Sequence, residues 1–188
     1  MFYVGSNDTK TIGRLVRTDF SKAFDCVDHT KAISKLVSLG CRSEILPWII
    51  SFISNRTQRV KYEGVISNNI NLTCGVPQGT KFGPIIFLAL IDDALNVPNC
   101  STWKYVENLS IGEVVNKLSQ SRMKNHVQNL VEWSDVNKLK LNPGKCKSMN
   151  FNFQRPKVDI PPLRMLDHVL ESVSETKLLG VWIQNDLK

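Results

Sequence analysis

Two acidic residues stand where predicted strands end, and their positions suggest a shared metal site. Asp19 follows the apolar and β-branched run "GRLVRT", and Glu107 lies in "KYVENLSI", where two short strands should meet in a hairpin. In an antiparallel sheet with neighbouring strands, these two carboxylates would converge. Carboxylate oxygens suit Mg²⁺, and a pair of such ions stabilises the attacking and leaving oxygens of phosphoryl transfer.

The alternative for any single acidic residue is a turn or a helix cap. Asp25, Asp28, Asp92 and Asp93 are most simply interpreted in that way. At the hairpin, Glu107 is followed by Asn108, which keeps an oxygen acceptor but carries no charge, so the attraction for a second Mg²⁺ is weakened.

The first elements that must position these residues are a strand and two helices. The strand ends at Asp19. A helix is expected from about Thr30 to Leu39, with Gly40 as its stop, and another from Ser43 to Ser54, with Ser43 as cap and Pro47 near the first turn.

Later segments add further strands and helices. "RTQRVKYE" and "NINLTC" predict two strands joined by "GVISN", and the run after "GVPQG" predicts a buried helix whose regular part starts after Gly83 and Pro84. An amphipathic helix places Met123, Val127, Leu130 and Val131 on one face, and the remaining chain is expected to form strands and turns. Without regular βαβ alternation, this order predicts an α+β fold with a largely antiparallel sheet.

The charge balance favours an anionic partner. The 188-residue chain has 24 Lys and Arg against 17 Asp and Glu, a net charge of +7, and its basic residues are dispersed rather than gathered in a tail. A polyanion lying along a folded groove fits this distribution, although a basic surface that only aids solubility fits it too.

Cysteine usage and hydropathy indicate an intracellular protein, in the nucleus or cytoplasm, with no membrane partner. The 5 cysteines are odd in number and form no C-x-x-C pair, so they are expected to be reduced and mostly buried. The longest apolar run, "IIFLALI", is far shorter than the roughly 18 to 20 residues of a membrane-spanning helix, and the N-terminus does not resemble a signal peptide.

Longer strings in one fixed order carry a family resemblance. "RTDFSKAFDCVDH", "GVPQGTKFGPIIFLALIDD", "KYVENLSI", "LKLNPGKCKSMNF" and "KLLGVWIQNDLK" together resemble the reverse transcriptase of non-LTR (LINE-type) retrotransposons, from about Gly13 to Lys188. The resemblance implies the palm of a right-hand polymerase, a small antiparallel sheet with helices packed on one face. Its implied partners are an RNA template, a DNA primer and deoxynucleoside triphosphates, and its implied cofactor is a pair of Mg²⁺ ions.

The resemblance also implies roles for single residues. Asp19 and Glu107 would hold metal, with the Phe20 carbonyl beside the same ion and Asn108 completing the turn. Phe24 would pack under the sugar of the incoming nucleotide, although a core aromatic fits it as well. Further roles fall to Gln78 and Gly79 near the nucleotide and template, to Lys145 as a proton donor or a plain exposed lysine, and to Leu179 and Gly180, which would support the primer end. Trp133 and Trp182 would fill core or inter-subdomain space.

Two departures from the family pattern bear on activity. Glu107 and Asn108 stand where the family carries Asp-Asp, so catalysis is expected to be lost or strongly impaired. The chain would also be a partial domain, 1–188, with the palm core at about 13–155, the primer-supporting hairpin at about 156–188, and most of the fingers and thumb missing. A nucleic-acid-binding or scaffold domain without catalysis, or the product of a decayed element, remain open alternatives.

Overall fold

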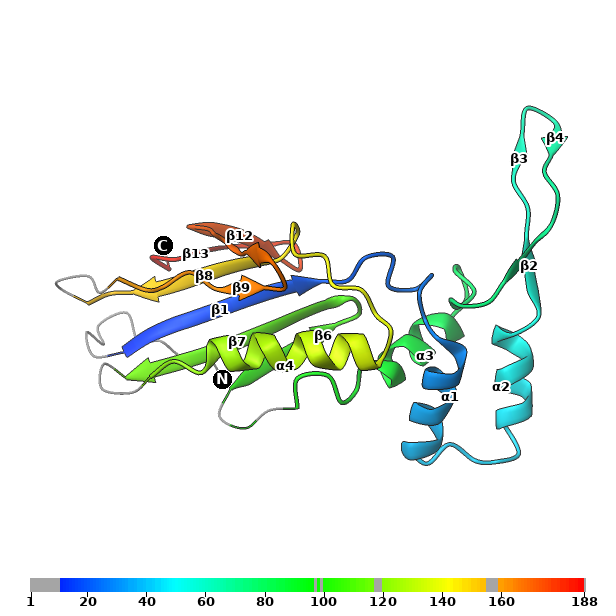
Figure 1. The fold of residues 1–188 in the computed structure, drawn as a ribbon, viewed down its shortest axis with the longest axis horizontal. Helices are drawn as coiled ribbons and strands as arrows, with labels where there is room; N and C mark the ends of the chain where they lie inside the picture. The colour runs from blue at the N-terminus through cyan, green and yellow to red at the C-terminus, as the bar shows by residue number, and fades with distance from the viewer. Residues whose placement is uncertain (1–10, 97, 99, 117–119, 155–158, 188) are drawn as a thin grey trace. The chain divides into compact units, whose positions relative to one another are not determined.

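The computed structural model describes residues 11–96, 98, 100–116, 120–154 and 159–187 (Figure 1). The chain divides into two compact units. The first comprises Met1–Ser21, Ala94–Ser134 and Leu141–Lys188, and the second comprises Lys22–Asp93 and Asp135–Lys140. In the described ranges, no helix has both the length and the apolar character needed to cross a membrane.

The first unit is built on a five-stranded sheet in the order β11-β8-β1-β7-β6. Its strands are β1 (Thr11–Asp19), β6 (Ser101–Tyr105), β7 (Asn108–Asn116), β8 (Lys147–Asn152) and β11 (Glu171–Ser172). All neighbours are antiparallel except β11 and β8. The predicted α+β class with a largely antiparallel sheet is therefore confirmed.

One face of this sheet carries an apolar cluster. Leu15, Met149 and Phe151 are buried together, and Val173 and Ile183 pack against them. Ile183 belongs to a separate hairpin formed by β12 (Glu175–Leu178) and β13 (Val181–Gln184). A second short hairpin, of β9 (Arg164–Met165) and β10 (His168–Val169), lies between β8 and β11 in the sequence.

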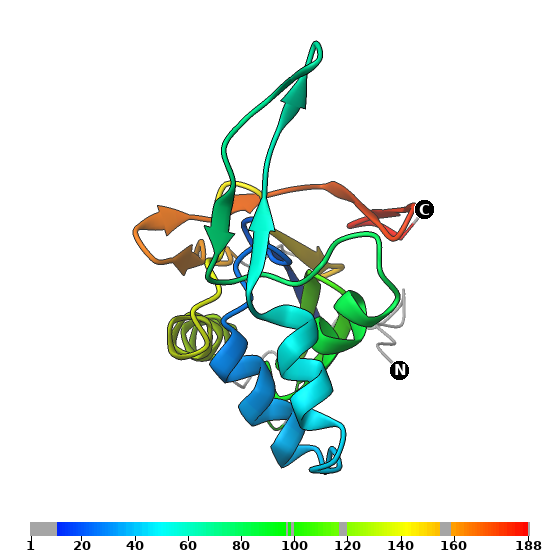
Figure 2. The same cartoon turned by 90° about the vertical axis from the view of Figure 1, so that its right-hand side faces the viewer.

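The helix α4 (Met123–Val136) runs alongside the sheet and is seen end-on in Figure 2. It buries Met123, Val127 and Leu130, as the predicted apolar face requires, while Val131 is only half-buried. Its Trp133 ring lies 6.2 Å from the ring of Phe20, which immediately follows β1. The helix is therefore fixed to the sheet near the end of the strand that carries Asp19.

The second unit contains the helices α1 (His29–Ser38), α2 (Leu46–Ile53) and α3 (Phe82–Leu90). Asp28 caps α1 by accepting the Lys31 N–H, and hydrogen bonds from Lys138 and then Lys31 lower the pKa of its carboxyl. At the other end, Gly40 adopts a φ of 84° and its N–H donates to the Val37 carbonyl, so the predicted glycine stop is confirmed.

Two predicted helix starts are wrong. Ser43 does not cap α2, because a turn in which the Ile45 N–H donates to the Arg42 carbonyl comes first and the helix begins at Leu46, one residue before Pro47. Helix α3 begins at Phe82 rather than after Pro84, because a proline in the first turn removes no intrahelical hydrogen bond.

A long two-part ribbon follows α2 in the second unit (Figures 1 and 2). Strands β2 (Arg56–Gln58) and β5 (Ile70–Leu72) pair at its base, and β3 (Lys61–Tyr62) and β4 (Val65–Ile66) pair at its tip. The predicted turn "GVISN" is therefore wrong, since Val65 and Ile66 are strand. The turn lies at Glu63 and Gly64, whose φ values of 46° and 83° suit a two-residue hairpin loop.

All five cysteines lie in described positions, and none of them forms a disulfide bond there. Only Cys146 is buried; Cys26, Cys41 and Cys100 are half-buried and Cys74 is exposed. The prediction that most of them are buried is wrong.

Candidate active site

The C-terminal end of β1 and the N-terminal end of β7 place Asp19 and Asn108 opposite each other in the sheet. Asp19 is the last residue of β1 and Asn108 the first of β7, and the antiparallel register pairs them directly. Opposite residues in an antiparallel pair have Cβ atoms roughly 4.5 to 5.5 Å apart. The convergence predicted from the sequence therefore involves the amide Asn108 directly, with Glu107 next to it in the turn.

The turn between β6 and β7 consists of Val106 and Glu107, since Tyr105 pairs with Asn108. We call Tyr105–Asn108 the metal turn, after the metal binding that the sequence predicts there. Val106 has a φ of 52°, the left-handed region that two-residue hairpin turns require at their first central position and that glycine normally supplies. A β-branched residue in this region is strained, so the metal turn holds Glu107 at some conformational cost.

Asp19 presents a carboxylate oxygen without a hydrogen-bond partner. Its side chain is 14% exposed, and among the residues that the structure describes its Oδ2 atom is buried and accepts no hydrogen bond. Lys145 Nζ lies 3.6 Å from that oxygen, close enough for an ion pair but not for a hydrogen bond. This oxygen therefore has the Lys145 ammonium as its charge partner but no hydrogen bond from the described part of the chain, and such an unsatisfied buried group needs a structural or functional explanation.

Lys145 is held near Asp19 by the backbone. Leu141 forms an isolated bridge with Phe20, and the Asn142 N–H donates to the Asp19 carbonyl at 2.9 Å. The Lys145 N–H then donates to the Asn142 carbonyl at 3.0 Å, closing the "NPGK" turn. Sequence reasoning selected Lys145 but missed Asn142, whose place in an Asn-Pro-Gly turn was the available signal.

Cys146 completes this corner as a buried neutral thiol. Its Sγ donates to the Asn142 carbonyl at 3.1 Å. Burial, with a smaller contribution from the Asp19 charge, raises the pKa of the thiol, so the group stays protonated at neutral pH. It contributes packing under the Asp19 backbone rather than a metal ligand.

The donor set fits one magnesium ion better than two. Asp19 and Glu107 supply carboxylates and Asn108 an amide oxygen, all of the hard type that Mg²⁺ prefers. The described residues contain no group of three or more His, Cys, Asp or Glu side chains that could hold a metal ion. The Asp19 oxygen that accepts no hydrogen bond within the described ranges is available as a ligand for one ion, whereas the neutral Asn108 adds no charge to hold a second.

Leu179 and Gly180 form the turn of the β12–β13 hairpin, and their φ values are 49° and 88°. Leu179 helps to line a pocket of about 330 Å³ together with Tyr105 and Asn108. The structure therefore brings this hairpin next to the metal turn. Trp182, expected to fill core or inter-subdomain space, is 62% exposed, so of these two alternatives the core is wrong.

The remaining predicted residues lie in the second unit. The turn around Gln78 is bonded to the segment around Phe24, since the Val76 N–H donates to the Phe24 carbonyl at 2.9 Å. Gln78 Nε2 donates to Asp25 Oδ1 at 2.7 Å, and Gly79 has a φ of 77°. The Phe24 ring lies 4.9 Å from that of the buried Phe87, so one side of Phe24 serves the core.

Two residues at this turn were missed from the sequence. Asp25, interpreted as a plain turn residue, accepts from Gln78, and Arg56 Nη2 donates to the Gly75 carbonyl at 2.5 Å. A Cβ at Gly75 would lie 2.8 Å from the Asp25 carbonyl oxygen, which explains the glycine. Asp25, Arg56 and Gln78 line a pocket of about 410 Å³. No local pattern identifies Arg56, because its partner carbonyl is far along the chain.

Comparison with known proteins gives one family and several relatives. The family model described as "Reverse transcriptase (RNA-dependent DNA polymerase)" matches residues 5–183. The chain is 36% identical over 93 residues to a 115 kDa protein of the type-1 retrotransposable element R1DM of Drosophila melanogaster, covering 48% of this chain and 9% of that protein. It is 27% identical over 185 residues to the RNA-directed DNA polymerase from mobile element jockey of Drosophila funebris. That match covers 90% of this chain and 19% of the jockey protein.

Solved structures show the same fold at low sequence identity. Apo telomerase from Candida tropicalis superimposes with a TM-score of 0.66 and 12% identity, over 97% of this chain and 32% of that one. A form truncated from its C-terminal domain superimposes with a TM-score of 0.65 and 13% identity. That match covers 97% of this chain and 36% of the telomerase chain. The chain thus spans at most about a third of these structures and a fifth or less of the two retrotransposon proteins.

Proposed function

Since this chain belongs to the reverse transcriptase (RNA-dependent DNA polymerase) family and is a domain of the non-LTR retrotransposon type, we propose that its ancestral reaction is RNA-templated DNA synthesis and that the present sequence performs it weakly or not at all. A single observation carries the second part. The residue directly opposite Asp19 is the neutral Asn108, so Glu107 is the one acid left at the turn where the family carries Asp-Asp.

The residues of the first unit would divide the work as follows. Asp19 and Glu107 would hold one Mg²⁺, which when bound would polarise a phosphate and assist the attack of a primer 3′-hydroxyl. Lys145 would donate a proton to the leaving pyrophosphate, and Leu179 with Gly180 would support the primer end. The Asn142 bond to the Asp19 carbonyl would keep Lys145 and the metal ligand in fixed relation.

In the second unit, Phe24, Gln78 and Gly79 would contact the incoming deoxynucleotide and the template. Gln78 is positioned by its hydrogen bond to Asp25, and a side chain added at Gly79 would meet no atom of the described residues, so the backbone of the turn is open at that residue. A nucleic-acid backbone can approach such a turn closely.

The predicted impairment follows from geometry and charge. Glu107 is one methylene longer than aspartate, and moving a catalytic group by about 1 Å can cost on the order of a hundredfold in rate. Asn108 removes a negative charge that would hold a second ion. The two substitutions act at the same metal turn, so their effects need not add.

The test is primer extension on an RNA template by a chimera in which this domain replaces the equivalent part of an active relative. Three forms are compared: the sequence as it stands, the revertant Glu107→Asp with Asn108→Asp, and that revertant with Asp19→Ala. We expect synthesis by the revertant alone. Equal synthesis by the unaltered form would contradict the impairment, and a silent but folded revertant would contradict the assignment of the metal turn.

Nucleic-acid binding without catalysis is the second candidate, favoured by the net charge of +7. Exposed Arg59 and Lys61 on the β2–β5 ribbon contribute to this charge. Binding of a primer-template duplex should then weaken steeply with salt and be indifferent to reversion at Glu107 and Asn108. A filter-binding series from low to high salt, run on both forms, measures this directly.

A further inference from the structure

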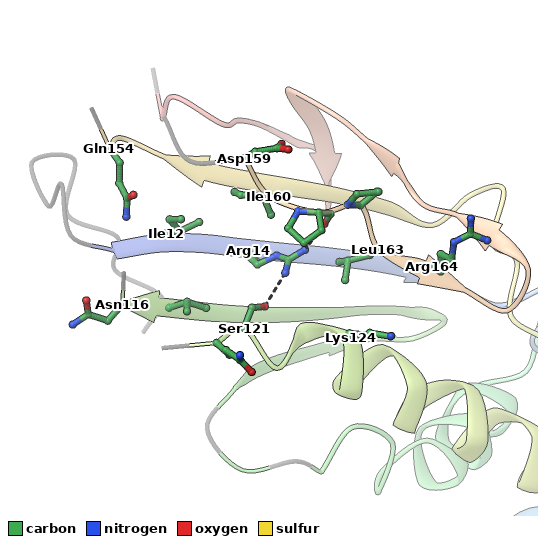
Figure 3. A pocket seen from close by; sticks show the side chains of 14 residues that line it. Ile12, Arg14, Asn116, Ser121, Lys124, Gln154, Asp159, Ile160, Leu163 and Arg164 are labelled. Atoms are coloured by element: carbon green, nitrogen blue, oxygen red, sulfur yellow. Dashed lines mark hydrogen bonds between the residues drawn. The ribbon is translucent and has the colours of Figure 1, made fainter. Parts of the chain in front are cut away.

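A large pocket lies in the first unit at the end of the sheet that is remote from the metal turn (Figure 3). We call it the far-end pocket. Its volume is about 820 Å³, and it is lined by the start of β1, the end of β7, the approach to α4 and residues 159–164. Ile12 in its wall precedes Asp19 by seven residues of the same strand, which corresponds to about 23 Å at 3.3 Å per residue. It is therefore separate from the candidate active site.

A buried amide with unmet hydrogen-bonding capacity lines this pocket. Gln154 is 1% exposed, and within the described part of the chain neither its Nε2 nor its Oε1 has a hydrogen-bond partner. Its side chain extends from the end of β8 toward Ile12 (Figure 3). Burying an amide without partners is costly, so a ligand that supplies one acceptor and one donor would recover that cost.

Arg14 provides a second polar group in the pocket wall. It is 6% exposed; its Nη1 donates to Ser121 Oγ at 2.7 Å, and Ser121 in turn donates to Glu113 Oε2 at 2.7 Å. Its Nε is buried and, as far as the described residues go, donates to nothing. Nη2 donates to the Pro161 carbonyl at 3.4 Å, so the guanidinium is fixed through both Nη atoms while its Nε–H remains unused by the described residues.

The rest of the lining is apolar with cationic side chains added. Ile12, Val115, Ile160, Pro161 and Leu163 supply flat apolar surface. Lys124 and Arg164 add two positive charges against the single carboxylate of Asp159. A matching ligand is a planar ring with adjacent donor and acceptor groups and an attached anion.

We propose that the far-end pocket binds a nucleobase carrying a phosphate, either as a free mononucleotide or as an unpaired nucleotide of an RNA strand. A glutamine amide pairs in a bidentate manner with a base edge, most readily with N6 and N7 of adenine. The volume falls in the usual range of small-ligand sites. This proposal requires neither metal nor catalysis, so its test is independent of the proposed polymerase function.

Binding is tested with the full chain in buffer containing EDTA. Adenosine monophosphate, adenosine and ribose 5-phosphate are titrated by calorimetry, and a short oligoadenylate is compared with an abasic oligomer of equal length. We expect Gln154→Met to weaken the adenosine ligands about tenfold or more while leaving ribose 5-phosphate unchanged. Response to the mononucleotide, or to the oligoadenylate alone, identifies which of the two sources supplies the base.

The same variant has a second readout, the stability of the free protein, which tests whether the Gln154 amide is unsatisfied without ligand. Because Gln154→Met removes an unsatisfied amide from a buried position at similar volume, the Tm of the free protein should rise by about 2 to 4 °C. A glutamine that only fills space would give unchanged affinity for the adenosine ligands, which would overturn the proposal.

Two further variants keep the proposal falsifiable if Gln154→Met fails to fold. Lys124→Met should weaken adenosine monophosphate several-fold and leave adenosine unchanged, because it removes a cation and not the base contact. Asp19→Asn should change neither affinity. Loss of binding in Asp19→Asn would assign the nucleotide to the metal turn and overturn the proposal, as would unchanged affinity in Lys124→Met or no binding of any ligand by the wild type.

Discussion

The hairpins β6–β7 and β12–β13 line the same 330 Å³ pocket, yet their two-residue turns use different residue types in the left-handed backbone region. Both turns have two residues. The β12–β13 turn has Leu179 at φ 49° and Gly180 at φ 88°, with glycine at one of the positions that need it. The β6–β7 turn places Val106 at φ 52°, a conformation in which a β-branched side chain is sterically strained.

The supporting contacts explain why both turns persist. Strand β7 pairs with β1 over nine residues, from Asn108 to Asn116, so the sheet imposes the conformation of the metal turn. The β12–β13 hairpin forms its own two-stranded sheet. It is tied to β1 through Arg17, whose Nη1 donates to the Lys177 carbonyl at 2.7 Å, and through Ile183 in the apolar cluster. The strained turn at Val106 therefore adjoins the long pairing of β7 with β1, and the turn that contains a glycine adjoins the short pairing of β12 with β13.

The largest expected effect comes from placing the strained residue type on the weakly held hairpin. Gly180→Val puts a β-branched side chain at φ 88° and should destabilise β12–β13 by about 2 kcal/mol. Amide hydrogen exchange should accelerate over residues 175–184 while β1 and β7 keep their protection. Gly180→Ala is the matched milder change, and wild-type protection in the valine variant would show that this turn is as firmly imposed as the other.

A smaller effect is expected when the tie to β1 is removed. Arg17→Met keeps the aliphatic stem but loses the bond to the Lys177 carbonyl, which should cost about 1 kcal/mol in local opening of the hairpin. Arg17→Lys is the control that keeps the charge and not the fork geometry. If exchange in 175–184 were unchanged in both variants, the apolar contact of Ile183 would be sufficient to hold the hairpin.

The smallest effect should have the opposite sign. Val106→Gly relieves the left-handed strain but adds backbone entropy to the unfolded chain, leaving a net stabilisation of about 0.5 kcal/mol. Urea unfolding of the full chain measures it, with Val106→Ala as the variant that relieves less of the strain. A destabilised glycine variant would mean that the turn is not strained and that the contrast between the two hairpins is wrong.

Hydrophobic periodicity and the residues that typically end helices and strands predicted much of the fold. The strand ending at Asp19, the helix stopped by Gly40 and the hairpin around Glu107 were all visible, because each depends on neighbours within a few residues. The start of α2 at Leu46 and the strand at Val65 were not predicted. A turn closed by the Ile45 N–H and the Arg42 carbonyl precedes α2, and the hairpin turns at Glu63 and Gly64 rather than within "GVISN".

The site divides along the same line. Asp19, Glu107, Asn108 and Lys145 came from motif strings, and the structure places Asp19 opposite Asn108 and beside Lys145. Arg56 is bonded to the Gly75 carbonyl, a contact between segments far apart in the chain. Gln154 has no local signature either, because what distinguishes it is burial without partners.

The register of β1 against β7 also governs how this sequence can change over generations. Substitution at position 107 or 108 leaves the pairing from Asp19 to Thr11 intact, whereas losing one codon within β7 would turn the following side chains to the wrong face. In the genetic code, asparagine and glutamate each become aspartate by the change of a single base. The turn is therefore one point mutation per position from the Asp-Asp pair that the family resemblance implies, as long as the reading frame is kept.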